Sequence, residues 1–387
     1  MAPAKGRERN WDRVRAEFPV AQNRVFLDHA RVAPIPRRAR EAVEAFTRDA
    51  CEHGTAHYDE WMAHAERVRE RFARLVHAEP GEIAFVKNTS EGLSLVAEGL
   101  DWKPGDNVVV PDIEFPSNVY PWWNLKPRGV ETRFVRSVDG RVPFDDLVKQ
   151  TDDRTRLVSV SSVEFHSGFR NDLNRIGAFC KDRGILFCVD AIQSLGCLPM
   201  DVKRDGIDFL AADGHKWLLS VEGLGGFYVS KDALEHLRPV LVGWDSVVDA
   251  HNFLDYDFTL RPDARRFEEG SFNVMSLYAL GASIGLLQEI GIDIIEDRVL
   301  GLGDRLLEEV RRRNLTLFSS PRPDERSGIV SFDLPADPDA FKTYMADHRV
   351  TLTVRGSRVR LSPHAYNNED DLGRFFDLFD RFLNGPG

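Results

Sequence analysis

The sequence lacks the features that mark several large classes of protein. None of its apolar runs approaches the ~20 residues that a membrane-spanning helix needs, so we expect a soluble protein without a membrane partner. Positive charge is not in excess, since the 387 residues carry a formal net charge of −11. A protein that binds nucleic acid regardless of sequence needs a basic face. The composition therefore predicts no nucleic-acid partner.

Cysteine is also scarce. The chain has only four cysteines, at Cys51, Cys180, Cys188 and Cys197. They lie in dissimilar contexts without CxxC spacing, which favours reduced thiols in a cytoplasm over disulfides or a zinc site. Met1–Asn10 is basic but lacks the apolar segment of a secretory signal. We therefore predict a cytoplasmic protein, and no metal, because the loop histidines His53 and His57 have no evident third ligand.

The order of apolar and polar segments predicts an α/β protein. Short apolar runs typical of buried strands, among them 83–86, 107–110, 156–161 and 185–190, alternate with helix-like segments. Beyond about residue 275 the alternation changes to a long amphipathic helix over 292–313 and short strands at 329–333 and 350–354. We predict an N-terminal arm over residues 1–24, a large domain over 25–274 and a small α+β domain over 275–387.

Two of the expected strands end in residues that suggest chemistry. Lys216 follows the apolar segment 206–210 by a few residues. A lysine held there is poorly hydrated, so its amine can lose a proton near neutral pH and attack an aldehyde; an ordinary solvated lysine is the alternative. The preceding strand ends in Asp190, and a buried acid needs a cationic partner such as a pyridinium nitrogen. Together the two residues favour the reactive lysine.

In this order Asp190, Gln193, His215 and Lys216 resemble the class V aminotransferase superfamily of fold-type I pyridoxal phosphate (PLP) enzymes, which includes the cysteine desulfurases. The resemblance runs from about residue 26 to residue 382. It implies a large domain with a mainly parallel, seven-stranded type of sheet flanked by helices. It also implies PLP as cofactor, an aldimine on Lys216, and contacts of all four residues with the cofactor.

The turn at residues 88–92 leads a strand into a helix, and free N–H groups at a helix N-terminus bind phosphate. The resemblance assigns Thr89 and Ser90 to the phosphate of PLP, although a simple helix cap is the alternative. It places Phe115 against the cofactor ring, where desulfurases have a histidine. It matches Ser271 to a serine that reaches the phosphate of the neighbouring subunit, which implies a homodimer with a shared active site. Asp213 stands where many relatives have a serine, and its role is left open.

On the substrate side, the resemblance makes Arg360 the residue that binds the α-carboxylate of an amino acid. Arg31, His57 and Glu164 lie in loops that correspond to the substrate side of the family's active site. For Arg31, pairing with a surface acid is an equal alternative.

The reaction after removal of the α-proton by Lys216 is open. Desulfurases of the family use a mobile cysteine just before the carboxylate-binding arginine, but residues 351–357 contain none, so persulfide chemistry would need Cys51. The His-Lys pair resembles desulfurases, C–S lyases and isopenicillin N epimerase-like enzymes. We predict β-elimination from a sulfur-containing amino acid, with transamination or epimerisation as the alternative. A non-catalytic binding protein on a PLP fold is more remote, as is a nucleotide-binding protein, since no GxGxxG follows the first strand.

Overall fold

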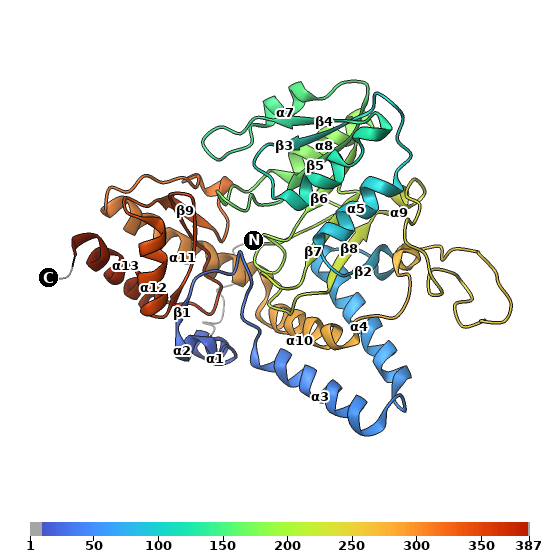
Figure 1. The fold of residues 1–387 in the computed structure, drawn as a ribbon, viewed down its shortest axis with the longest axis horizontal. Coiled ribbons are helices and arrows are strands. Elements are labelled where there is room, and N and C mark those ends of the chain that lie inside the picture. The colour runs from blue at the N-terminus through green and yellow to red at the C-terminus, as the bar shows by residue number, and fades with distance from the viewer. Residues whose placement is uncertain (1–9, 386–387) are drawn as a thin grey trace, which may run out of the picture.

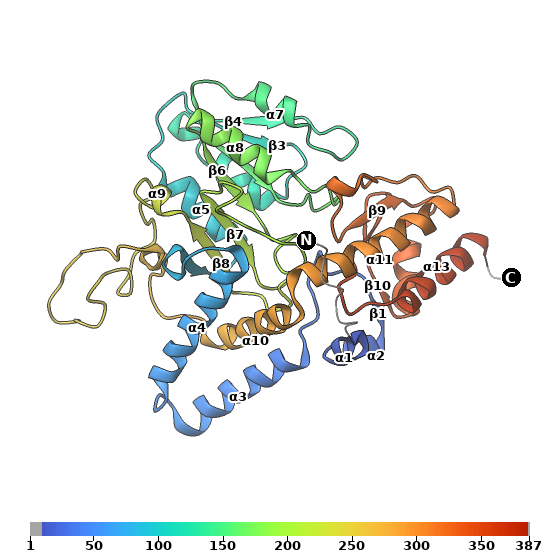
Figure 2. The same ribbon diagram turned by 180° about the vertical axis from the view of Figure 1, so that it is seen from behind.

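The structure, a computed structural model, describes residues 10–385. Of the segment Met1–Asn10, for which we predicted no secretory signal, only Asn10 lies inside this range. Two lobes lie side by side in Figure 1, with the strands of the large lobe on one side and the C-terminal helices on the other. From behind, in Figure 2, α10 (Val274–Ile290) and α11 (Ile292–Arg312) run in succession from the large lobe to the small one.

A seven-stranded sheet organises the large lobe, in the order β2-β8-β7-β6-β5-β3-β4. Its strands are β2 (Ile83–Val86), β3 (Asn107–Pro111), β4 (Glu131–Val135), β5 (Thr155–Ser161), β6 (Leu186–Asp190), β7 (Phe209–Asp213) and β8 (Gly225–Val229). The two pairs that β8 forms, with β2 and with β7, are antiparallel; the other pairs are parallel. The predicted α/β fold with a mainly parallel sheet is confirmed.

Both faces of this sheet are buried, which explains why its strands are almost uninterrupted runs of apolar residues. In β3, Val108 and Val110 join one hydrophobic cluster while Val109 joins another on the opposite face. Successive side chains of a strand point to opposite faces, so each run supplies both clusters at once.

Helices surround the sheet and build most of the small lobe. Besides α10 and α11, they are α1 (Trp11–Ala16), α2 (Val20–Asn23), α3 (Arg37–His53), α4 (Tyr58–Val76), α5 (Thr89–Gly99), α6 (Tyr120–Trp123), α7 (Phe144–Gln150), α8 (Leu173–Arg183), α9 (Lys231–Leu234), α12 (Pro338–Asp347) and α13 (Glu369–Asn384). Between residues 10 and 385 no single helix is long and apolar enough to span a membrane, and α10 with α11 meets that test only as a pair bent by 81°.

The small lobe has its own core and a three-stranded sheet, β11-β12-β9, made of β9 (Val330–Asp333), β11 (Thr353–Arg355) and β12 (Arg358–Leu361). The strand expected over 350–354 is divided in two: β10 (Val350–Thr351) pairs instead with β1 (Val25–Phe26). The start of the chain is thus tied to the small lobe, and the salt bridge between Arg15 and Asp371 adds to this contact. The exact domain boundaries stay a prediction.

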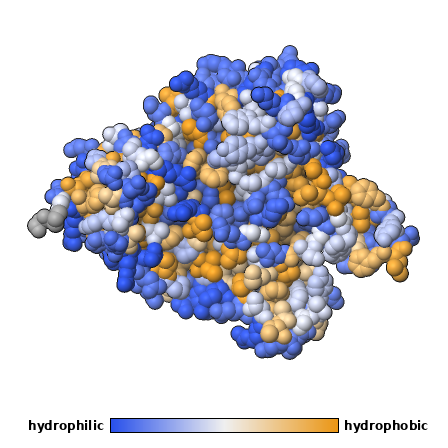
Figure 3. All heavy atoms as spheres, viewed as in Figure 1, coloured by the Kyte–Doolittle hydropathy of each residue, from blue (hydrophilic) through white to orange (hydrophobic). Residues whose placement is uncertain are grey.

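One loop of the large lobe projects away from it. It joins α9 to a short helical turn at residues 264–267 and carries several exposed apolar side chains, and orange spheres lie among blue ones on this projection in Figure 3. The most exposed are Leu254 and Tyr256, at 98% and 95%. An exposed apolar surface of this kind is typical of a site that binds another molecule.

Candidate active site

Four adjacent strands of the large sheet lead into buried acids at the same edge. Asp213 ends β7 and Asp190 ends β6, whereas Glu164 and Glu114 each follow three residues after the last residue of β5 and β3. All four side chains are buried. The carboxyl edge of an open α/β sheet is where such folds bind ligands.

A pocket of about 190 Å³ opens at this edge and is lined by Lys216, Asp190 and Phe115, among others. Lys216 is only 8% exposed. Burial lowers the pKa of Lys216 to about 8, although the charge of Asp190 acts in the opposite direction. Burial also raises the pKa of Asp190 to about 6, against a hydrogen bond that Oδ1 accepts from the N–H of Ile192 at 3.0 Å. At neutral pH the pocket therefore presents an ionised acid and a lysine that releases its proton readily.

The N-terminus of α5 forms one wall of the pocket. Asn88 caps this helix, and Gly92 lets it approach β7, because a Cβ there would lie 2.7 Å from that of Ala211. The close packing brings Thr89 Oγ1 within 3.0 Å of the Asp213 N–H, which donates to it. Free N–H groups and hydroxyls at such a helix start suit an anion.

Two further hydroxyls and a contact between an acid and a histidine complete this wall. Ser90 Oγ donates to Ser117 Oγ at 2.7 Å, and both residues line the pocket. Asp213 Oδ2 lies 3.0 Å from Nδ1 of His215. The carboxylate of Asp213 thus lies beside His215, and its N–H bonds to α5.

Phe115 and Gln193 lie at the remaining positions expected to meet the cofactor. Lys216 Nζ is 5.5 Å from the centroid of the Phe115 ring, and that ring meets Phe165 edge to face at 5.2 Å. Gln193 lines the pocket. Its Nε2 donates to the carbonyl of Ala30 at 3.0 Å and its Oε1 accepts from the indole of Trp217 at 3.1 Å. These bonds fix the loop before Arg31 against the lysine segment.

Arginines form the opposite wall, but not in the arrangement expected. Arg31 and Arg355 line the pocket, whereas Arg360 does not. Arg360 is fully buried behind them, with Nη1 donating to the carbonyl of Phe165 at 2.8 Å and Nη2 lying 3.3 Å from Asp28. Burial lowers the pKa of Arg360 to about 10 and raises that of Asp28, so desolvation outweighs their mutual attraction.

Three other residues expected at the site lie elsewhere. His57 Nδ1 contacts Asp49 at 2.7 Å where α3 meets α4, away from the pocket lining. Glu164 is fully buried behind the pocket and accepts a hydrogen bond from Asn171. Ser271 is exposed just before α10 and does not line the pocket of its own chain. The structure thus brings the residues expected to hold the cofactor together, except Ser271, and leaves His57 and Glu164 out.

The family model of aminotransferase class-V matches residues 25–375. The chain belongs to this family. A probable cysteine desulfurase of Methanothermobacter thermautotrophicus is 32% identical over 93% of this chain and 94% of its own length.

Solved structures agree with this class-V fold. The apo structure of a cysteine desulfurase from Thermococcus onnurineus superposes with a TM-score of 0.90 at 26% identity, covering 98% of this chain and 100% of the other. A cystine C–S lyase in complex with cysteine persulfide has a TM-score of 0.87 at 24% identity, covering 94% and 99%. Because its identity is only 24%, the similarity to the cystine C–S lyase supports the fold alone.

The class-V chain is a PLP-dependent enzyme, and its pocket fits the cofactor. Lys216 is buried and readily deprotonated, as an aldehyde-binding lysine must be. Asp190 lines the same pocket, where it can pair with a protonated ring nitrogen, and the start of α5 offers hydroxyls for a phosphate. The carboxylate of Asp213 repels that phosphate less than an isolated carboxylate would, because Oδ2 contacts His215.

Sequence reasoning missed Arg355 and Ser117. Arg355 ends β11 and pairs in register with Arg358 across the hairpin to β12, so it lies one strand away from the expected carboxylate-binding segment. The run of arginines on both sides of this turn was the available signal. Ser117 carried no signal of its own, because only the fold of the loop after β3 brings it to Ser90.

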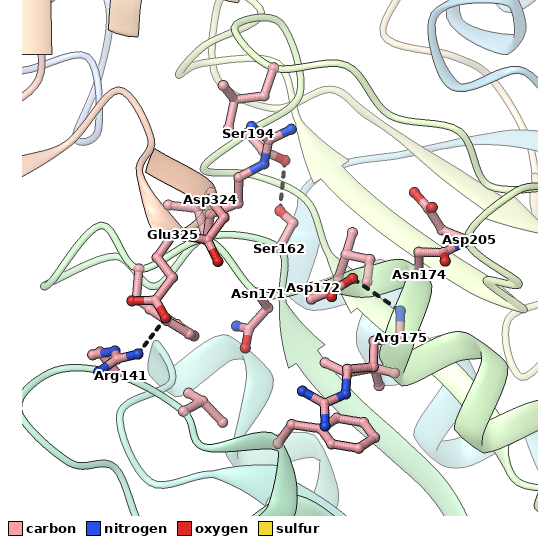
Figure 4. Close-up of a pocket in the computed structure, with 18 of the residues that line it drawn as sticks. Arg141, Ser162, Asn171, Asp172, Asn174, Arg175, Ser194, Asp205, Asp324 and Glu325 are labelled. Atoms are coloured by element: carbon pink, nitrogen blue, oxygen red, sulfur yellow. Dashed lines mark hydrogen bonds and ion pairs between the residues drawn. The ribbon is translucent and has the colours of Figure 1, made fainter. Parts of the chain in front are cut away.

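A larger cavity, of about 630 Å³, lies beside this site and reaches the loop at residues 322–325 of the small lobe. Ser162, Asn171 and Ser194 line its inner side in Figure 4, where Ser162 and Ser194 bond to each other. Ser162 also donates its N–H to the carbonyl of Asp190 at 2.9 Å. The cavity therefore lies directly behind the acid of the cofactor pocket.

Proposed function

We propose that this enzyme catalyses β-elimination from a sulfur-containing amino acid, as a C–S lyase. The observation that carries the proposal is a pocket in which a readily deprotonated lysine faces an acid and arginines, with no thiol in its lining. The named relatives, a probable cysteine desulfurase and a cysteine desulfurase, support a sulfur-containing amino acid as substrate.

PLP, when bound, supplies an electron sink for the α-carbanion of the substrate. Lys216, with a pKa of about 8, is the base that removes the α-proton. Asp190 would keep the ring nitrogen protonated, and Thr89, Ser90 and His215 would hold the phosphate. Phe115 and Gln193 would also contact the cofactor.

Arginines orient the substrate in this proposal. Arg31 and Arg355 line the pocket, and the Nε atoms of Arg355 and Arg360 have no hydrogen-bond partner in the part of the chain that the structure describes. Guanidinium groups bind carboxylates through paired, charge-assisted hydrogen bonds. Arg360 takes the α-carboxylate once substrate competes with Asp28, and Arg31 and Arg355 supply the neighbouring donors.

The four cysteines favour elimination over transfer of sulfur to the enzyme. None of them lines the pocket; Cys51 is exposed on α3 and the other three are buried elsewhere. The Cβ–S bond breaks, the sulfur keeps the electron pair, and it leaves with the proton that Lys216 removed, as hydrogen sulfide from cysteine or as a persulfide from cystine. Water then converts the remaining enamine into a 2-keto acid and ammonia.

A product assay tests this proposal. Enzyme loaded with PLP is incubated with cysteine or cystine without added keto acid, and pyruvate is measured. Pyruvate formation supports elimination. Amino exchange that requires a 2-keto acid supports the transaminase alternative, and inversion at Cα without pyruvate supports the epimerase alternative; either result without pyruvate rejects the lyase.

We infer that the partner is a second copy of the chain. The apolar loop around Leu254 and Tyr256 leads through residues 264–267 to the exposed Ser271, so docking of the loop on a second copy would carry Ser271 toward that copy's phosphate site. We expect Leu254→Asp to yield monomers in analytical ultracentrifugation and Ser271→Ala to weaken PLP binding. Unchanged association and PLP affinity in both variants would contradict the shared site.

We also propose a cytoplasmic enzyme. All four cysteines are free, and three are buried, as suits a reducing compartment. Mass spectrometry of the protein purified under non-reducing conditions is expected to find four unpaired thiols.

A further inference from the structure

Two of the four buried acids at the sheet edge have no cation beside them. The charges of Asp190 and Asp213 both act on Lys216. In residues 10–385, no lysine, arginine or histidine bonds to Glu114 or Glu164. The charged groups that act on Glu164 are the acids Glu114, Asp190 and Asp112. A buried carboxylate without a cation is so costly that the group takes up a proton instead.

The hydrogen bonds indicate which of the two glutamates, Glu114 or Glu164, holds a proton more firmly. Glu114 accepts two of them from Ser161, from its N–H and its Oγ–H, both at 2.5 Å. Glu164 accepts only one, from Nδ2 of Asn171 at 2.9 Å, and its Oε2 has no partner among the residues described. Two donors stabilise a carboxylate better than one. Glu164 therefore holds its proton more firmly than Glu114 does.

The electrostatics place the two groups in the same order. Burial raises the pKa of Glu114 to about 8, and burial followed by the charge of Glu114 raises the pKa of Glu164 well above its ordinary value. The effect reaches the cofactor pocket, because Ser161 of β5 is the direct neighbour of Asp190 in β6.

We propose that Glu164 is a positioning residue that stays protonated at neutral pH and thereby leaves Asp190 as the ionised carboxylate facing the cofactor. Asn171 holds it in place, since its Nδ2 also donates to the carbonyl of Ser161 at 2.8 Å. Asn171 lies between this carboxyl and the large cavity of Figure 4. The inference goes beyond the proposed function, because it concerns the charge at Asp190 whichever reaction follows.

Infrared spectroscopy of the apoenzyme tests the protonation state directly. In deuterated buffer at pH 7, the wild type is expected to show the C=O stretching band of a protonated carboxyl group that Glu164→Gln loses. The matched control Glu235→Gln, at an exposed position after α9, keeps the whole band, and Glu114→Gln keeps the Glu164 component. A band that is unchanged in Glu164→Gln overturns the proposal.

A second readout separates positioning from a merely structural role. When rising pH ionises Glu164, a further negative charge appears behind Asp190 and changes the absorption spectrum of the PLP-loaded enzyme. Glu164→Gln is expected to lose the part of this transition that lies above the pKa of about 8 of Glu114, while keeping the neutral-pH spectrum and the wild-type unfolding temperature at pH 7. Identical pH titrations for both proteins would contradict the role. Neither measurement uses a substrate, so failure of the lyase proposal leaves both results interpretable.

Discussion

The two walls of the pocket are built differently. The cofactor wall consists of Asp190, Lys216 and the start of α5, at the ends of strands that pair throughout the sheet. The substrate wall consists of arginines from a loop and from a short hairpin of the small lobe. Backbone pairing holds the first wall rigidly, whereas the second depends on contacts between segments more than 300 residues apart, such as Arg360 with Asp28.

This difference teaches that the two walls have separate tasks. Rigid strand ends suit chemistry, which loses rate when reacting groups move by about 1 Å. Arginines on a hairpin can exchange one carboxylate partner for another, so they suit substrate binding. Substitutions in the cofactor wall should therefore lower kcat, and those in the substrate wall should raise KM.

The largest effect is expected for Lys216→Ala. Loss of the base should lower kcat by roughly 10²- to 10⁴-fold, measured by steady-state kinetics of pyruvate release. The visible band of PLP that borohydride bleaches should also disappear. Activity within tenfold of the wild type would place the base elsewhere.

Asp190→Asn should have the next largest effect. The amide cannot hold a proton on the ring nitrogen, so kcat should fall by roughly 10²- to 10³-fold, as when one electrostatic contact of a transition state is removed. The unfolding temperature serves as the control for folding. An unchanged kcat in a folded variant would show that another group sets the protonation of the ring.

The substrate wall is tested by Arg355→Ala. One hydrogen bond to a charged group contributes about 1.5–3 kcal/mol, so KM should rise roughly 10- to 100-fold with little change in kcat. The matched control is Arg358→Ala, whose partner Asp333 lies outside the pocket lining. That half-buried pair should change KM by less than about fivefold. Equal effects of the two substitutions would remove the distinction between the walls.

The smallest effect is on stability. Because the pKa of Lys216 is about 8 in the folded apoenzyme, below its ordinary value of 10.5, the unfolded chain binds more protons between these pH values. Stability should therefore rise as pH increases from about 8 toward 10.5, by at most about 3 kcal/mol. Urea unfolding at pH 8 and pH 10 measures this gain, which Lys216→Met should lose. The same gain in both proteins would assign it to other groups.

The contrast between the walls also explains what the sequence could predict. Lys216, Asp190 and Thr89 follow strands, and the rule that ligands bind at the carboxyl edge was enough to bring them together. Arg355 and the bond between Arg360 and Asp28 depend on how distant loops pack. Alternation predicted apolar strands for both lobes, but nothing in residues 350–354 signals that β10 and β11 pair with different partners.

Glu164 was expected in the pocket for a related reason. Its place after β5 brought it to the correct edge of the sheet, but the side chain turns to Asn171. The direction of a side chain in a loop depends on its tertiary contacts, which no local pattern records.

The most direct test of the account is the identity of the products formed from cysteine by the wild type and by Cys51→Ser, whose altered residue is the one exposed thiol among the four cysteines. We predict pyruvate and ammonia at equal rates from both proteins, since no thiol of the enzyme takes part. Formation of alanine by the wild type, lost in Cys51→Ser, would contradict elimination and show that the enzyme takes the sulfur onto its own cysteine.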